Sequence, residues 1–71
     1  MKDIHFYNSD IKKFFDNHAG FWRLDPCGYV GGGSYAIDIL DCDGMVLETF
    51  LYGSSFEYEQ DLAGIRKLAQ P

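Results

Sequence analysis

A short turn signal near the middle of the chain constrains the fold more than any other feature. Asp43-Gly44 separates two runs rich in strand-forming residues, Ser34–Cys42 and Met45–Gly53. Asp-Gly is preferred in two-residue type I′ turns, because both central positions of that turn need a positive φ. The pattern therefore predicts an antiparallel β-hairpin made of residues 34–42 and 45–53.

The register that this turn predicts divides the hairpin into two faces, and both are largely apolar. One face holds a bulky and continuous set, which we expect in the core: Ile37, Ile39, Val46 and Phe50. The other face is more mixed: Ala36, Asp38, Leu40, Cys42, Met45, Leu47, Thr49 and Leu51. Its large apolar side chains form a wider patch than a small monomer usually exposes.

A first helix is predicted before the hairpin, over about residues 9–19. Ser9 or Asn8 is placed to cap it, and Gly20 is placed to end it. Its apolar side chains recur at i, i+3, i+4 and i+7: Ile11, Phe14, Phe15 and His18.

A second helix is predicted after the hairpin, over about residues 55–70. Ser54 and Glu57 have the spacing of a capping box. Arg66 and Lys67 lie near its C-terminal end, where the helix dipole favours positive charge. The stripe expected to be buried is Tyr58, Leu62, Ile65 and Ala69.

The remaining segments have weaker signals. Residues 3–7 fit either a short strand or a backward extension of the first helix. Gly20–Leu24 alternates like a strand, and Asp25-Pro26 with Gly28 indicates a turn. Gly31-Gly32-Gly33 indicates a flexible connector or a strand bend.

Together these elements predict one small two-layer α+β domain over residues 1–71. An antiparallel sheet, made of the hairpin and one or two short strands, packs against two helices. The expected centre of the core is Phe14, Phe15, Ile37, Phe50, Leu62 and Ile65. Two helices cover only one face of such a sheet. Either the N-terminal segment or the strand at Phe21-Trp22 folds over the other face, or that face is an apolar interface formed by Leu40, Met45, Leu47 and Leu51.

Acidic residues are concentrated in the middle of the chain. The formal net charge is −5, but residues 24–65 hold eight acidic residues and no Lys or Arg. This balance disfavours direct binding to nucleic acid, because phosphate contacts need Lys and Arg. It fits a solvated surface that keeps the domain soluble, or an acidic face for a basic protein partner. The candidate partner-binding carboxylates are Asp38, Asp41, Asp43, Glu48, Glu57, Glu59 and Asp61.

No motif points to catalysis, a cofactor, a metal or a membrane. Cys27 and Cys42 lack zinc-site spacing and, without an evident signal peptide, are expected as reduced thiols in the cytoplasm. The Asp-x-Asp-Gly segment fails as a calcium loop, because Ile39 and Phe50 stand where Asp and Glu are required. No apolar run is long enough to span a bilayer. We therefore expect a protein that is not an enzyme.

The spacing of the carboxylates suggests a more specific partner. Asp41 with Asp43 at the hairpin tip, and Glu57 with Asp61 on the last helix, are expected to lie about 5–7 Å apart. Successive phosphates of a nucleic-acid strand lie on a comparable scale. An array of this kind fits a channel of Lys and Arg side chains, with binding that weakens as salt rises.

A compact acidic α+β domain with Asp41-Cys42-Asp43-Gly44 at a hairpin tip and Glu57-x-Glu59-x-Asp61 on a helix resembles small inhibitors encoded by phages and mobile elements. Anti-CRISPR proteins and DNA mimics are examples. The resemblance covers size, charge and architecture. It implies a stoichiometric inhibitor of a nucleic-acid-handling complex.

The sequence thus predicts a non-enzymatic domain that docks its carboxylate-rich hairpin and helix on a basic, nucleic-acid-binding target. The alternative is a homo-oligomeric structural or accessory subunit, with the apolar sheet face as the seam of a homodimer.

Overall fold

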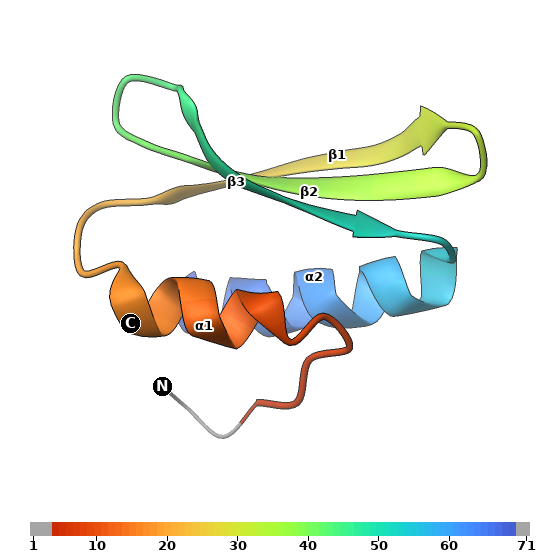
Figure 1. The fold of residues 1–71 in the computed structure, drawn as a ribbon, viewed down its shortest axis with the longest axis horizontal. Helices are drawn as coiled ribbons and strands as arrows, with labels where there is room; N and C mark the ends of the chain where they lie inside the picture. The colour runs from red at the N-terminus through yellow and green to blue at the C-terminus, as the bar shows by residue number, and fades with distance from the viewer. Residues whose placement is uncertain (1–3, 70–71) are drawn as a thin grey trace.

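The structure, a computed structural model, describes residues 4–69 of the chain. Its elements follow in the order α1 (Asp10–Asn17), β1 (Arg23–Gly31), β2 (Ser34–Leu40), β3 (Val46–Tyr52) and α2 (Ser55–Ala69). The strands form one antiparallel sheet in the order β1-β2-β3. Both helices lie against the same face of that sheet (Figure 1). The predicted small α+β fold is confirmed.

A tight turn of glycines joins β1 to β2. Gly31 pairs with Ser34, and the two residues between them, Gly32 and Gly33, have φ values of 61° and 76°. Positive φ at both central positions is what a type I′ turn requires. The glycine segment therefore forms a defined hairpin turn and not the flexible connector or bend that the sequence indicated.

β1 is longer than predicted and contains the residues that were expected to form a turn. Asp25 pairs with Asp38, Pro26 pairs with Ile37, and the register then shifts by one residue at Cys27. Proline is tolerated in β1 because this is an edge strand, where a missing N–H breaks no ladder bond. The predicted turn at residues 25–28 is wrong, because a bulge accommodates these residues within the strand.

The turn between β2 and β3 lies where it was predicted but has a different type. Only Gly44 has a positive φ, 84°, and a type I′ turn would need one at Asp43 as well. The N–H of Gly44 donates to the carbonyl oxygen of Asp41 at 3.1 Å, and the N–H of Asp41 donates to that of Met45 at 2.8 Å. The longer turn shortens the strands, which end at Leu40 and begin again at Val46.

An irregularity in β3 moves one predicted core residue to the surface. The predicted pairing holds along residues 35–39 of β2, but Leu40 pairs with Val46, and Leu47 is left without a partner. The extra residue puts Val46 on the same face as Leu40, where its side chain is 53% exposed. The placement of Val46 in the core is therefore wrong. The other members of that set are buried: Ile37, Ile39 and Phe50.

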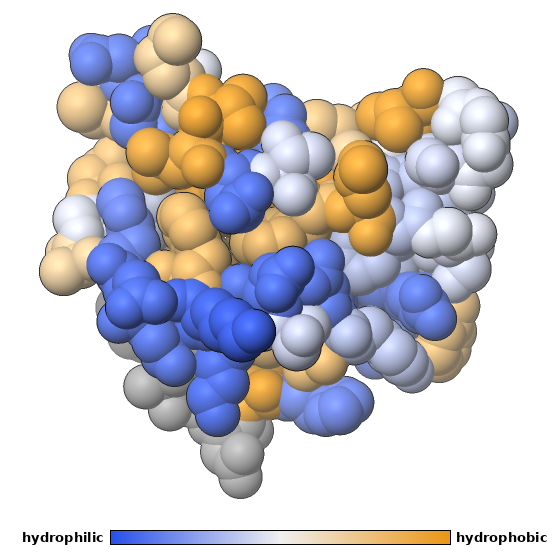
Figure 2. All heavy atoms as spheres, viewed as in Figure 1, coloured by the Kyte–Doolittle hydropathy of each residue, from blue (hydrophilic) through white to orange (hydrophobic). Residues whose placement is uncertain are grey.

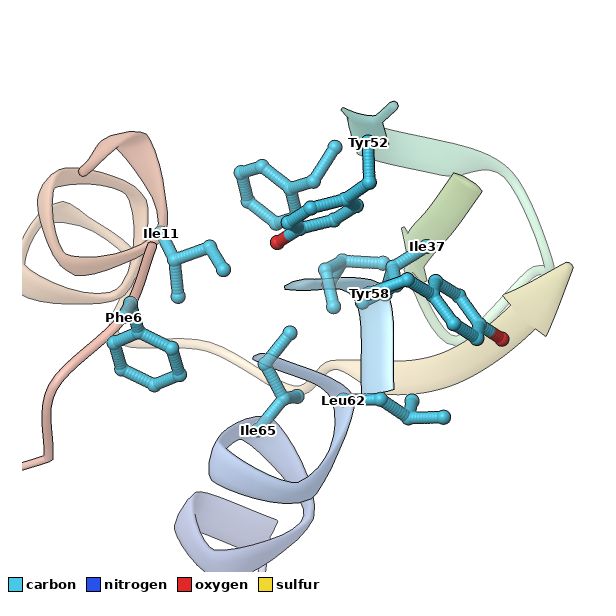
Figure 3. Close-up of a cluster of buried hydrophobic side chains, with 9 residues drawn as sticks. Phe6, Ile11, Ile37, Tyr52, Tyr58, Leu62 and Ile65 are labelled. Atoms are coloured by element: carbon cyan, nitrogen blue, oxygen red, sulfur yellow. The ribbon is translucent and has the colours of Figure 1, made fainter. Parts of the chain in front are cut away.

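The core fills the space between the sheet and the helices. Figure 3 shows Phe6 and Ile11 approaching it from the N-terminal side, and Leu62 and Ile65 approaching from α2. The buried cluster is Phe6, Ile11, Ile37, Ile39, Phe50, Tyr52, Tyr58, Leu62 and Ile65. Four of the six residues predicted at its centre are among them, whereas Phe14 and Phe15 are half-buried against it. Ala69, predicted in the buried stripe, is exposed.

The helix ends follow local hydrogen bonds. Asn8, not Ser9, caps α1, because its Oδ1 accepts the N–H of Asp10 at 2.9 Å. α1 ends at Asn17, two residues earlier than predicted, because His18 adopts an extended conformation.

The start of α2 agrees with the predicted cap. Ser54 Oγ accepts the N–H of Glu57 at 3.3 Å. The predicted helix end at Gln70 lies outside the described residues.

Neither of the two segments that could have covered the second sheet face does so. The segment of residues 4–9, which forms neither helix nor strand, lies in the helix layer, with Phe6 beside Gly64 of α2. Trp22 packs against Phe15, with ring centroids 4.7 Å apart. Within residues 4–69, therefore, no segment covers the face of the sheet opposite the helices.

Candidate docking surface

The uncovered side of the sheet, which we call the outer face, is defined by strand alternation. Ile37 and Ile39 of β2 point into the core, so the residues between and beside them point outward. The pairing extends this face across the three strands. Its members are Arg23, Asp25 and Cys27 of β1, Ala36, Asp38 and Leu40 of β2, and Val46, Thr49 and Leu51 of β3.

Exposed apolar side chains gather on and beside the outer face. Leu51 is 65% exposed, and Met45, which enters β3 from the turn, is 66% exposed. Leu47 is 38% exposed, and Leu40 is half-buried. Figure 2 shows hydrophobic atoms over the sheet layer, while hydrophilic atoms dominate over α1 below it. The structure thus leaves the four predicted interface residues accessible, and it adds Val46, which sequence reasoning missed.

A polar row crosses the middle of the outer face. Asp25, Asp38 and Thr49 pair side by side on β1, β2 and β3. The hydroxyl of Thr49 donates to Asp38 Oδ1 at 2.7 Å. Two carboxylates directly opposite one another on a sheet repel, so a cation placed between them is favoured. Asp25 was missed as a site residue because the sequence placed it in a turn.

Cys27 joins this row through the bulge in β1. Its sulfur and the carboxylate oxygens of Asp25 and Asp38 all lie within 4.8 Å of one another. Partial burial, a hydrogen bond to Asp38 and the nearby negative charges raise the pKa of the Cys27 thiol above its usual value. The thiol is therefore protonated at neutral pH and is a poor nucleophile. In residues 4–69 this is the one group of three such side chains close enough to share a metal ion.

The carboxylates at the β2–β3 turn have different roles. Asp41 is half-buried, and its Oδ1 accepts the N–H groups of Asp43 and Met45, both at 2.9 Å. Its carboxylate therefore holds the turn together. Asp43 is exposed at the tip and is the member of the predicted pair that is available to a partner.

The remaining predicted carboxylates do not lie on the outer face. Glu48 is exposed on β3, where its Oε1 accepts the N–H of Thr49 at 3.2 Å. Glu57 is half-buried and Glu59 is exposed, both on α2 in the helix layer. The structure thus separates the hairpin carboxylates from the helix carboxylates, which the sequence had combined into one surface.

Asp61 corrects the prediction most clearly, because its side chain is fully buried. Its Oδ1 accepts the N–H of Tyr7 at 2.8 Å. Its Oδ2 accepts the N–H of Asn8 at 3.0 Å and the hydroxyl of Tyr52 at 2.6 Å. Asp61 is therefore not a partner-binding residue and forms no exposed pair with Glu57. It attaches the N-terminal segment to α2, a role that the sequence does not signal.

Comparisons with protein-family models, with curated protein sequences and with solved structures found no match. Between residues 4 and 69, no helix has the length and apolar character needed to cross a membrane.

Proposed function

We propose that this chain is a non-enzymatic protein-binding domain whose outer face docks on a basic surface of a partner protein. The proposed partner is a nucleic-acid-binding protein or complex in the cytoplasm, which the domain inhibits by occupying its basic surface. One observation carries the proposal: exposed apolar side chains and the opposed carboxylates of Asp25 and Asp38 share one uncovered face.

The apolar part of the outer face supports a protein partner. Apolar side chains lie on both sides of the central polar row, and methionine is among the residues enriched in protein interfaces. Leu51, Val46 and Met45 are each more than half exposed on adjoining parts of one strand and its turn. An exposed cluster of this kind on a small domain is typical of an interaction surface.

The charge of the outer face supports a basic partner. Arg23 is the one Lys or Arg in the three strands, whereas Asp25 and Asp38 lie at the middle of the face. Asp43 adds an exposed carboxylate at the hairpin tip. Lys and Arg side chains on a partner complement this pattern, and the attraction between exposed charges weakens as salt rises.

The same charges argue against the alternative, a homodimer formed by two outer faces. In a two-fold interface the same patch meets itself. Asp25 and Asp38 would then be buried near their own copies, with Arg23 as the one basic residue of the face. Burying carboxylates without partners is strongly unfavourable.

The test compares two variants that lose the same charge from opposite layers. Asp25→Asn with Asp38→Asn removes two charges from the outer face, and Asp16→Asn with Glu59→Gln removes two from the helix layer. Each is used at low and high salt to capture proteins from cell extract. We expect the wild type and the helix-layer variant to capture a nucleic-acid-binding protein. We expect the outer-face variant to fail to capture it. Equal capture by both variants contradicts it.

The oligomeric state of the chain alone separates the proposal from its alternative. Size-exclusion chromatography with light scattering is expected to give a monomer at all salt concentrations. A dimer that persists at high salt and is broken by Leu51→Asp would favour the homodimer seam instead.

A further inference from the structure

The two edges of the sheet are unequal. β1 contains Pro26, which has no N–H to donate, and its pairing with β2 is interrupted twice, at Cys27 and at Val30. Proline and bulges are devices that keep an edge strand from pairing with another chain. The β1 edge is therefore protected.

The β3 edge has no comparable protection over its second half. Val46–Tyr52 contains neither Pro nor Gly, and residues 48–52 pair with β2 without a break. The N–H of Thr49 donates to the side chain of Glu48 at 3.2 Å, a partner that an N–H pointing away from β2 can reach. Because backbone groups alternate in direction along an antiparallel strand, those of Thr49 and Leu51 both point away from the sheet. Leu51 thus presents its N–H and C=O groups to a further strand, and Thr49 presents its C=O group and an N–H that such a strand would take over from the Glu48 side chain.

Two hollows lie between this edge and the helix layer, and each contains a carboxylate. One, of about 410 Å³, is lined by Asp10, Lys13, Phe14, Asn17, His18 and Glu48. The other, of about 190 Å³, is lined by Tyr7, Asn8, Leu51, Tyr52 and Glu57. Side chains of an added strand alternate between the outer face and the helix side. Those on the helix side therefore meet Asp10, Lys13 and Glu48 in the larger hollow, or Glu57 in the smaller one.

We propose that the partner contributes an extended segment that adds to the sheet as a fourth strand beside β3, with Lys or Arg side chains over the two hollows and apolar side chains continuing the outer face. This inference rests on the proposed function and specifies how the outer face engages its partner. Backbone hydrogen bonds supply affinity in such strand addition, and alternate side chains supply specificity.

The charges at the edge favour this occupant over a second copy of the chain. β3 contains no Lys or Arg, so a copy paired edge to edge brings Glu48 to the site and no cation. The larger hollow would then hold two carboxylates for its one lysine, Lys13, and the smaller hollow would hold Glu57 with no Lys or Arg in its lining. A segment with basic residues at alternate positions supplies one to each hollow.

The test uses a synthetic probe, a nine-residue peptide of alternating valine and lysine with blocked ends. Its control has glutamate in place of lysine. Amide hydrogen exchange of the wild-type protein, read by NMR, is expected to slow at Leu51 and Thr49 when the lysine peptide is added, and to stay unchanged with the glutamate peptide. Exchange that slows at β1 and not at β3, or slows at neither edge, overturns the inference.

Two variants at one position separate the backbone from the side chain. Leu51→Pro removes an outward N–H, and we expect it to weaken peptide binding about tenfold. Leu51→Ala keeps that N–H and removes only side-chain contact with the peptide, so we expect its loss of binding to be at least about threefold smaller than that of Leu51→Pro. Circular dichroism checks that Leu51→Pro is folded. If this variant does not fold, the hydrogen-exchange experiment on the wild-type protein decides whether a strand is added beside β3.

The inference and the proposed function fail in different ways. If Asp25→Asn with Asp38→Asn abolishes capture of the partner while Leu51→Pro leaves it intact, the outer face docks without strand addition and only the inference is overturned. If neither variant changes capture, the proposed function is overturned too. If Leu51 and Thr49 are protected without peptide in a dimeric protein, the edge pairs with a second copy and the inference is wrong.

Discussion

At the scale of single residues, Tyr52 shows how burial and charge act on one side chain. Its hydroxyl is buried and donates to Asp61 Oδ2 at 2.6 Å. Burial, this hydrogen bond and the negative charges of Asp61 and Glu57 raise the pKa of Tyr52 far above that of an ordinary tyrosine. The folded protein therefore holds this proton more tightly than the unfolded chain does.

That raised pKa predicts a loss of stability at alkaline pH. The contribution of Tyr52 is complete below about pH 10, the pKa of an unfolded tyrosine, and is lost as pH rises above that value. The free energy of unfolding should fall by up to about 1.4 kcal/mol per pH unit from this proton. Urea titrations between about pH 9 and pH 11 measure it. Tyr52→Phe should make the decline shallower, and an unchanged slope would contradict the assignment.

The burial of single residues was also difficult to predict from the sequence. Glu57, Glu59 and Asp61 look alike in the sequence, as acidic residues in the first half of a helix. Only Asp61 is buried, because the N-terminal segment brings two N–H groups to it from more than fifty residues away. No local pattern encodes such a partner, so a buried carboxylate was predicted to be a surface charge.

At the scale of elements, Asp61 holds the N-terminal segment on α2. Asp61→Asn should lower the free energy of unfolding by about 2–3 kcal/mol, because hydrogen bonds to a buried charge are lost and the amide NH2 meets a backbone N–H. Chemical denaturation measures the change. Glu59→Gln, an exposed neighbour on the same helix, is the control and should change stability by less than about 0.5 kcal/mol. Equal effects of the two substitutions would contradict this role.

The turns show why the sequence predicted the hairpin correctly but predicted its turn type and part of its register wrongly. Asp43-Gly44 correctly marked a hairpin, yet the positive φ at both central positions belongs to Gly32 and Gly33. Both glycine signals fit a turn, and the pairing of whole strands decides which geometry each adopts. The bulge that moves Val46 outward also depends on how whole strands pair. One added residue in β3 reverses the face of the side chains that precede it in that strand.

At the scale of the whole molecule, two adjacent residues of β3 test the assignment of the layers. Phe50 is 1% exposed in the core, and Leu51 is 65% exposed on the outer face. Phe50→Ala should cost about 3–5 kcal/mol of stability, because it leaves a cavity. Leu51→Ala should cost less than about 1 kcal/mol. Thermal or urea unfolding compares them, and a larger loss from Leu51→Ala than from Phe50→Ala would mean that the two faces are reversed.

The structure of the whole molecule also shows that the acidic residues in the middle of the chain do not form one surface. From sequence, the charge of residues 24–65 described one surface around a hairpin and a helix. In the structure it divides into the outer face, the β2–β3 turn, the helix layer and one buried group. Alternation and the coverage of one sheet face by two helices were predictable. The distribution of charge between layers required the true register and the three-dimensional path of residues 4–9.

The anchoring of the N-terminal segment by Asp61 favours a late place for that segment in the order of folding. Tyr7 and Asn8 are bound by a carboxylate that lies more than fifty residues later in the sequence. The three strands follow one another directly, so their pairing closes short loops, whereas the contact with Asp61 closes a loop of more than fifty residues. Residues 4–9 are therefore expected to be among the last to reach their final positions.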